Sequence, residues 1–240
     1  MKNLFLFLFV AIAVTACKKN SDDAPQPPGG GGSSAIRIKS VTYSNGVEHL
    51  TYDAQGRIIL DVDPDGSKEE YEYLPGIVNE KVYAINGDYK YSYKNELNSD
   101  GEVTRTTRSD FPANEELLYY NPDKSLTKRI SKSNGFIQTT DYFYSNGNCD
   151  SLRFSSNGQW NSTIVKTFYA DKLNNISMEN FGFLFYGKQD KNLQKSEEYK
   201  YPDGSSNGIE TYVYEFDQQG RITKLTSTHN NNIYISLYTY

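Results

Sequence analysis

Polar and apolar side chains alternate along most of the chain after residue 36. Residues 71–73 read Tyr-Glu-Tyr and residues 89–93 read Tyr-Lys-Tyr-Ser-Tyr, which places rings on one face and polar groups on the other. A period of two is typical of a half-buried β-strand, because successive side chains of a strand point to opposite faces. No stretch shows a convincing 3.6-residue apolar period of an amphipathic helix. The pattern therefore predicts an all-β fold.

Turn residues separate the alternating runs at short intervals. Asn-Gly or Asp-Gly pairs occur at residues 45–46, 65–66, 86–87, 100–101, 134–135, 146–147, 157–158 and 203–204. These pairs accept positive φ angles at little cost and are typical of tight hairpins. We predict about 15–18 short strands, each paired antiparallel with the next in an up-and-down meander.

A meander of this kind must protect its two edge strands. It can close into a barrel, in which the strand after Ile36 meets the last strand at residues 233–240, or it can remain a half-open barrel. Residues 181–187 interrupt the alternation and form the most apolar stretch after the N-terminal region, and a polar stretch follows at 188–195. We interpret this part as a long connection whose aromatic side chains plug an open end or the interior.

The N-terminal residues have the composition of an export signal. Lys2 precedes an apolar run at residues 4–13, and small residues lead to Cys17. The run is shorter than the roughly 20 residues of a membrane-spanning helix. A cysteine at this place resembles a bacterial lipoprotein signal, which implies cleavage after residue 16 and acylation of Cys17. The alternative is an ordinary secretory signal that contains a cysteine.

The residues after Cys17 predict a linker and then one domain. Residues 18–23 resemble the acidic export tag of surface lipoproteins from Bacteroides-like bacteria, which implies a protein on the cell surface of the outer membrane; a periplasmic position is the alternative. Residues 24–34 are rich in Pro and Gly, so we predict that 17–35 form a flexible tether of roughly 30 Å. Residues 36–240 are long enough for a single domain with a substantial core.

Charge and reactive residues exclude several functions. The formal net charge is −5 and basic clusters are missing, which argues against a nucleic-acid partner. Cys149 has no second cysteine beyond Cys17, and we interpret it as a buried apolar residue rather than a nucleophile. His49 and His229 are too few for a zinc site. The sequence has no nucleotide-binding or Ser-nucleophile motif, so we expect no enzyme and no catalytic residues, although a carboxylate pair cannot be selected from 30 acidic residues.

One acidic stretch matches the spacing of a calcium loop. Hard oxygen ligands at alternate positions, followed by a later acid, are what Ca²⁺ requires. The flanking residues are predicted strands, which favours a plain hairpin turn and no metal cofactor. The candidate ligands are Asp61, Asp63, Asp65, Glu69 and Glu72.

Two resemblances follow from the motifs. Residues 52–60 and 212–225 carry a Tyr-Asp-x-x-Gly-Arg or Phe-Asp-x-x-Gly-Arg unit that resembles the YD repeats of Rhs-type proteins. Residues 171–175, 186–193, 201–204, 212–225 and 237–240, together with the lipoprotein signal, resemble a family of uncharacterised Bacteroides-type lipoproteins with a porin-like fold. This resemblance implies a barrel-like β fold and transfers no activity or site residues.

The sequence thus predicts an acyl-anchored, monomeric, non-enzymatic binding or accessory module. With 21 Tyr, 12 Phe and Trp160, aromatic rings are the best candidates to bind a glycan or a lipid. The first alternative is a structural or adhesive surface protein that contacts another protein. A more distant alternative is a barrel inserted in the outer membrane.

Overall fold

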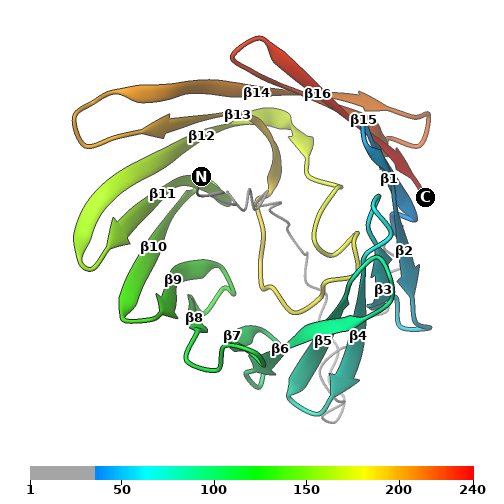
Figure 1. The fold of residues 1–240 in the computed structure, drawn as a ribbon. Coiled ribbons are helices and arrows are strands. Elements are labelled where there is room, and N and C mark those ends of the chain that lie inside the picture. The colour runs from blue at the N-terminus through cyan, green and yellow to red at the C-terminus, as the bar shows by residue number, and fades with distance from the viewer. Residues whose placement is uncertain (1–35) are drawn as a thin grey trace.

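The computed structural model describes residues 36–240, which form a closed antiparallel barrel of sixteen strands (Figure 1). Each strand pairs with its neighbours in sequence, and β1 closes the barrel by pairing with β16, with Val41 opposite Tyr238. The predicted up-and-down barrel is therefore confirmed, and the half-open alternative is wrong. The predicted signal at 1–16, the acylated Cys17 and the tether at 17–35 lie outside the described residues.

The strand lengths vary more than the sequence pattern suggested, from 4 residues in β1 to 15 residues in β12. In the described part of the chain, no helix has the length and apolar character needed to cross a membrane. The strands are β1 Ser40–Tyr43, β2 Gly46–Tyr52, β3 Ile58–Val62, β4 Lys68–Leu74, β5 Ile77–Tyr83, β6 Tyr89–Leu97, β7 Val103–Arg108, β8 Glu115–Tyr120, β9 Leu126–Ser133, β10 Phe136–Ser145, β11 Asn148–Ser156, β12 Gln159–Leu173, β13 Asn192–Lys200, β14 Ser206–Phe216, β15 Ile222–His229 and β16 Asn232–Thr239.

The repeated Asp-x-x-Gly-Arg motif is a hairpin turn with its own ion pair. Asp53 accepts hydrogen bonds from the backbone N–H of Arg57 at 2.9 Å and from its Nε at 2.6 Å. Gly56 takes a φ of 74°, which costs a glycine little. Asp217 and Arg221 repeat the same two contacts at the same distances. The motif recurs because the same local turn joins β2 to β3 and β14 to β15.

Antiparallel topology sends successive turns to opposite ends of the barrel. One end, here called the plugged end, carries the turns at 53–57, 75–76, 98–102, 121–125, 146–147 and 217–221 and the long connection at 174–191. The other end, the open end, carries the turns at 44–45, 63–67, 84–88, 109–114, 134–135, 157–158, 201–205 and 230–231.

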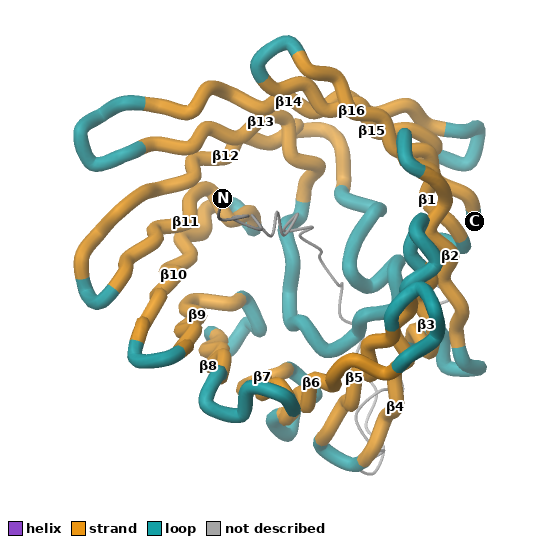
Figure 2. The backbone as a smooth tube through the Cα atoms, viewed as in Figure 1, coloured by secondary structure: helices purple, strands orange, loops and turns teal. Residues whose placement is uncertain are grey.

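The long connection between β12 and β13, residues 174–191, lies inside the ring of strands, and we call it the plug (Figures 1 and 2). Backbone hydrogen bonds fasten it to the wall: the N–H of Ile58 donates to the carbonyl of Gly182 and the N–H of Val103 to that of Phe185. Lys188 donates to the carbonyl of Lys124. The plug is thus held at several separate hairpins of one end.

Aromatic side chains of the plug complete the hydrophobic core. Phe185 is 3% exposed, and its ring lies 4.7 Å from that of Tyr186 and 6.3 Å from that of Tyr73. Phe183 meets Tyr71 edge to face at 5.5 Å. The prediction that residues 181–187 plug an end or the interior is confirmed. These rings fill the interior of the plugged end, so we look for a ligand site at the open end.

Candidate ligand-binding mouth

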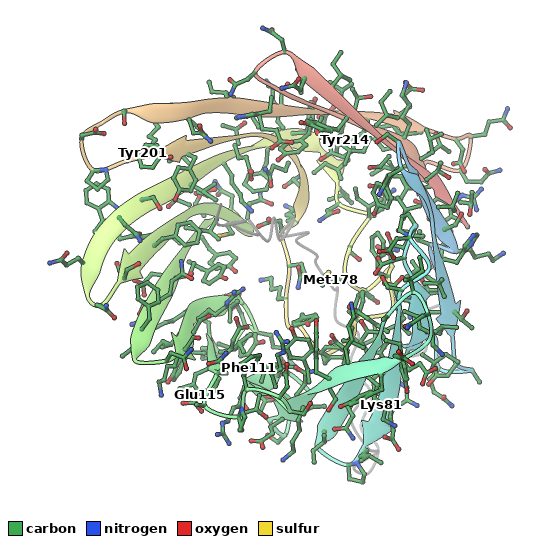
Figure 3. All side chains as sticks on the ribbon, in the orientation of Figure 1. Lys81, Phe111, Glu115, Met178, Tyr201 and Tyr214 are labelled. Carbon is green, nitrogen blue, oxygen red and sulfur yellow. The ribbon has the colours of Figure 1, made fainter. Side chains whose placement is uncertain are left out.

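Exposed aromatic side chains surround the open end. Each one lies within or next to a hairpin of that end, and each exposes between 37% and 59% of its surface. We call this set the aromatic rim: Tyr43, Tyr89, Phe111, Phe136, Trp160, Tyr201 and Tyr234. Figure 3 shows Phe111 and Tyr201 well apart around the barrel wall. Large half-exposed rings are typical of recognition surfaces, because a ring offers a rigid apolar face at small entropic cost.

A recess of about 450 Å³ opens at this end between β1, β2 and β16. Its volume is in the range of small-molecule sites. It combines two rim tyrosines with carboxylates and small polar groups, so it offers both stacking faces and hydrogen-bonding atoms. The lining residues are Tyr43, Ser44, Asn45, Glu48, Asp63, Pro64, Tyr234, Ile235 and Ser236.

Carboxylates continue from this recess into the barrel. Register places Asp61 opposite Leu50 on one side and opposite Glu69 on the other, while Glu80 stands opposite Tyr71. Leu50 and Tyr71 are buried, which shows that these positions face inward. The inner face of β2 to β5 is therefore lined with acids below the recess.

Burial controls how these acids hold their protons. Desolvation, reinforced by the charges of Glu48, Glu69 and Asp63, raises the pKa of Asp61 to about 9. Desolvation likewise raises the pKa of Glu80 to about 8, with Glu69 adding to the effect. At neutral pH these two side chains stay protonated and can donate hydrogen bonds. These carboxyl donors lie below the recess, whose own lining carries the carboxyl groups of Glu48 and Asp63.

The lysines of the same strands do not neutralise this inner surface. Lys68 pairs with Glu70 at 2.6 Å and Lys81 pairs with Glu72 at 3.4 Å, both on the outer face. Tyrosine hydroxyls serve the inner acids instead, since Tyr43 donates to Glu48 at 2.7 Å and Tyr71 to Glu69 at 2.6 Å. The chemistry of the mouth is therefore acidic, aromatic and rich in hydrogen-bonding groups.

We expect the substitution Asp61→Asn to stabilise the barrel at neutral and alkaline pH. The folded pKa of Asp61 lies near 9 and the ordinary value is 3.8. Between these values the unfolded chain has released a proton that the folded chain retains, so the free energy of unfolding falls as pH rises. The amide of Asn carries no titrating proton and removes this loss. Thermal melting should show the same free energy of unfolding for Asp61→Asn and the native chain near pH 4, and a value about 1–3 kcal/mol higher for Asp61→Asn at pH 8.

An exposed acid provides a control of opposite sign. Hydrogen bonds from Ser67 lower the pKa of Asp65, so Asp65→Asn should lose a little stability above the ordinary carboxyl pKa. If Asp61→Asn changed the melting temperature equally at pH 4 and pH 8, the interior acid would not be the cause.

The five acids of the candidate calcium loop do not all come together, although Asp61 stands opposite Glu69. Residues 63–67 form a hairpin turn, in which Gly66 donates to the carbonyl of Asp63, and Asp65 accepts from Ser67. Asp61 and Glu69 face the lumen, whereas Glu72 lies on the outer wall beside Lys81. A strand alternates its side chains between two faces, so calcium-loop spacing cannot converge here. Across residues 36–240, no group of three or more His, Cys, Asp or Glu side chains is placed to hold a metal ion.

Cys149 is 5% exposed, and its sulfur donates to the carbonyl of Ser151. Burial raises the pKa of the thiol to about 12. We expect no reaction with a thiol-specific disulfide reagent at pH 8 in the native protein, and full reaction in urea, because only a thiolate attacks such a reagent. Rapid labelling of the native chain would contradict this assignment. His49 lies on the outer face of β2, and His229 forms a hydrogen bond with the side chain of Asn230 at 2.9 Å.

Two solved structures share this barrel. A porin-like protein from Bacteroides uniformis ATCC 8492 aligns with 84% of this chain and 94% of its own length, at a TM-score of 0.58 and 18% identity. A porin-like protein from Bacteroides vulgatus ATCC 8482 aligns with 85% of this chain and 99% of its own length, at a TM-score of 0.60 and 14% identity. No protein-family model matches the sequence, and a search of curated proteins finds no match either.

At these identities the two structures show a shared fold. They confirm the resemblance to porin-like Bacteroides proteins at that level, while the lipoprotein character and the YD repeats stay predictions.

The sequence showed that aromatic residues are unusually numerous, but it did not show where in the fold they lie. It missed that the rings separate into a buried set around the plug and an exposed set at the open rim. One signal could have found the rim: its members lie in or beside alternate turns of the meander, which a barrel collects at one end. The sequence grouped Asp61 with Glu69 but missed Glu48 and Glu80 on the same inner face, because the register of β2 to β5 was unknown.

Proposed function

We propose that this protein is a non-enzymatic binding module, held to the outer membrane by an acylated Cys17, that binds a glycan at its open mouth. The observation that carries the proposal is the aromatic rim of the open end together with a recess of about 450 Å³, which two rim tyrosines and two acids line. Sugar rings present apolar C–H faces and many hydroxyl groups. Exposed rings can stack on those faces, and protonated and ionised carboxyl groups can exchange hydrogen bonds with the hydroxyls.

The outer wall supports a tethered barrel rather than one that spans the bilayer. Outward ion pairs join Lys94 to Glu96 at 2.8 Å and Arg105 to Glu115 at 3.0 Å, near the middle of the wall. Each Lys or Arg on the lipid face of a spanning barrel costs about 2–4 kcal/mol at the bilayer midplane. The charged outer positions of β4 to β9 would together make insertion strongly unfavourable.

The filling of the plugged end favours a shallow site over a deep pore. Phe181 and Phe185 occupy the interior together with Ile176, and each is no more than 6% exposed. A long acyl chain would need a deep apolar cavity, and the rings that could have formed one are packed on each other. This geometry favours a polar ligand at the rim, and it ranks a glycan above a lipid.

A glycan array probed with the mature chain tests the proposal, followed by calorimetric titration of any hit. We expect Tyr234→Ala and Glu48→Gln each to weaken binding by about tenfold, because each removes a contact of the recess. Phe143→Ala is the matched control: its ring is 44% exposed but lies on the outer wall. The glycan affinity of the Phe143→Ala variant should equal that of the native chain.

Other outcomes would reject a glycan ligand. Binding to a lipid array alone, or equal losses in Tyr234→Ala and Phe143→Ala, would refute the proposed site. A glycan array with no hit would reject the glycan proposal and favour the alternative of a protein that contacts another protein.

A further inference from the structure

The outer wall of the barrel is divided into two unlike surfaces. On β4 to β9 the outward positions carry ion pairs such as Lys81 with Glu72 and Lys132 with Glu115. On β14 to β16 most outward positions are aliphatic or threonine, and the ion pair of Lys224 with Glu215 borders them on the side of the plugged end. Five of the aliphatic side chains there expose 43–64% of their surface: Ile209, Val213, Ile233, Ile235 and Leu237.

Strand register makes these side chains one continuous surface. Val213 stands opposite Thr226, which stands opposite Ile235 on the next strand. Leu237 then stands opposite Thr42 of β1, and Thr42 opposite Val47 of β2. We call these residues, with Ile209, Ile233 and Thr228, the apolar face. A contiguous patch of aliphatic and threonine side chains over five strands, bordered by Lys224 beside Leu237, is typical of an interaction site.

The place where the chain enters the barrel favours a membrane as the occupant of the apolar face. The N–H of Lys39 donates to the carbonyl of Thr239 at 2.8 Å, so the chain enters the barrel at the β1–β16 seam, which the apolar face crosses. Residues 18–35 separate Cys17 from Ile36. The sequence predicts a tether of roughly 30 Å over residues 17–35, which would keep the seam close to the membrane that holds the anchor.

The chemistry of the face also favours lipid over protein. Protein interfaces draw most of their binding energy from Trp, Tyr and Arg in well-packed pockets. The apolar face offers aliphatic chains and threonine hydroxyls instead, and the rings of the rim lie at the open end. Aliphatic side chains gain by entering the boundary between headgroups and acyl chains.

We propose that the apolar face of β14, β15, β16, β1 and β2 rests on the bilayer that holds the tether, so that the barrel lies on its side with its mouth in water. The inference rests on the membrane tether of the proposed function; the apolar face shares Ile235 with the lining of the recess but requires no particular ligand at the mouth. It assigns opposite roles to the two outer surfaces, the apolar face toward lipid and the charged surface of β4 to β9 toward water.

A depth measurement tests this placement. The mature chain with Cys17→Ser carries an N-terminal histidine tag and is held on phosphatidylethanolamine–phosphatidylglycerol vesicles that contain a nickel-chelating lipid. This arrangement keeps the tether at its own place whether or not Cys17 is acylated in the cell. An environment-sensitive fluorophore is attached at Ile235→Cys or, as the control, at Lys81→Cys on the far outer wall (Figure 3). Cys149 is buried and stays unlabelled.

We expect doxyl-labelled lipid to quench the Ile235→Cys probe about threefold more than the Lys81→Cys probe. Adding Val213→Lys and Ile233→Lys should abolish the difference, while flotation through the tag persists. Equal quenching of the two probes on floated vesicles would overturn the proposal. A dimer in light scattering, with the Ile235→Cys probe already blue-shifted in the absence of vesicles, would also overturn it and assign the face to a second copy. Acylation is read separately, by mass spectrometry of the native chain, so failure of the anchor and failure of the face are distinguishable.

Discussion

Gly182→Ala is expected to lower the melting temperature by about 10 °C, because the added methyl group has no space in the plug. A Cβ at this position would lie 2.7 Å from the backbone nitrogen of Ile58 and 2.7 Å from the ring of Tyr52. The neighbours cannot move apart easily, since the N–H of Ile58 donates to the carbonyl of Gly182 itself. The φ of 79° adds strain for any residue with a side chain.

Gly158→Ala provides a matched control for Gly182→Ala. Gly158 has a φ of 81°, nearly the same as Gly182, but a Cβ there meets nothing within 4 Å. The control should lose only the backbone term of about 1 kcal/mol, or roughly 2–4 °C for a domain of this size. The difference between the two variants measures the steric contact between plug and wall. Equal losses would mean that the plug does not pack against Ile58 and Tyr52.

Phe185→Ala is expected to reduce the free energy of unfolding by about 3–5 kcal/mol, the usual cost of removing a buried ring. Phe185 is 3% exposed and lies among Tyr73, Phe183 and Tyr186. Its loss would leave a cavity that the fastened plug cannot close. Urea denaturation followed by near-ultraviolet circular dichroism, which reports on packed aromatic side chains, measures the change.

Phe143→Ala is the control for the loss of a ring without burial. Phe143 is 44% exposed on β10, and its substitution should cost less than about 1 kcal/mol. A similar loss in both variants would show that the interior of the plugged end is not the stabilising core. A small loss for Phe185→Ala alone would place the plug outside the cooperative unit that unfolds with the barrel.

Two turns and one apolar run show which parts of the structure the local sequence pattern could predict. The Asp53 and Asp217 turns were predictable, because an Asp, a Gly and an Arg at fixed spacing make a turn from their own atoms. The apolar run at 181–187 was recognisable as a connection, because it breaks the alternation on either side. The wall residues that this connection contacts were not predictable, because nothing in the sequence near Gly182 or Phe185 specifies contact with Ile58 or Val103.

The acidic stretch shows the opposite case, in which local spacing was misleading. Asp61, Asp63, Asp65, Glu69 and Glu72 match a calcium loop when the chain is imagined as one loop. The structure divides them between a lumen, a turn and an outer wall, because β3 and β4 alternate around the turn at 63–67. The same alternation brings Glu48 and Glu80 to the inner face from neighbouring strands, which no local spacing predicts.

The amino-acid sequence alone determined the strand class, the hairpin order and the chemistry of each turn, because period-two alternation and turn residues act through neighbouring positions. Closure by Val41 and Tyr238, the seating of the plug, and the sorting of rings and acids into a core, a mouth and an outer face depend on strands far apart along the chain. Only the tertiary structure decided these, because register between distant strands is set by the packing of the whole barrel.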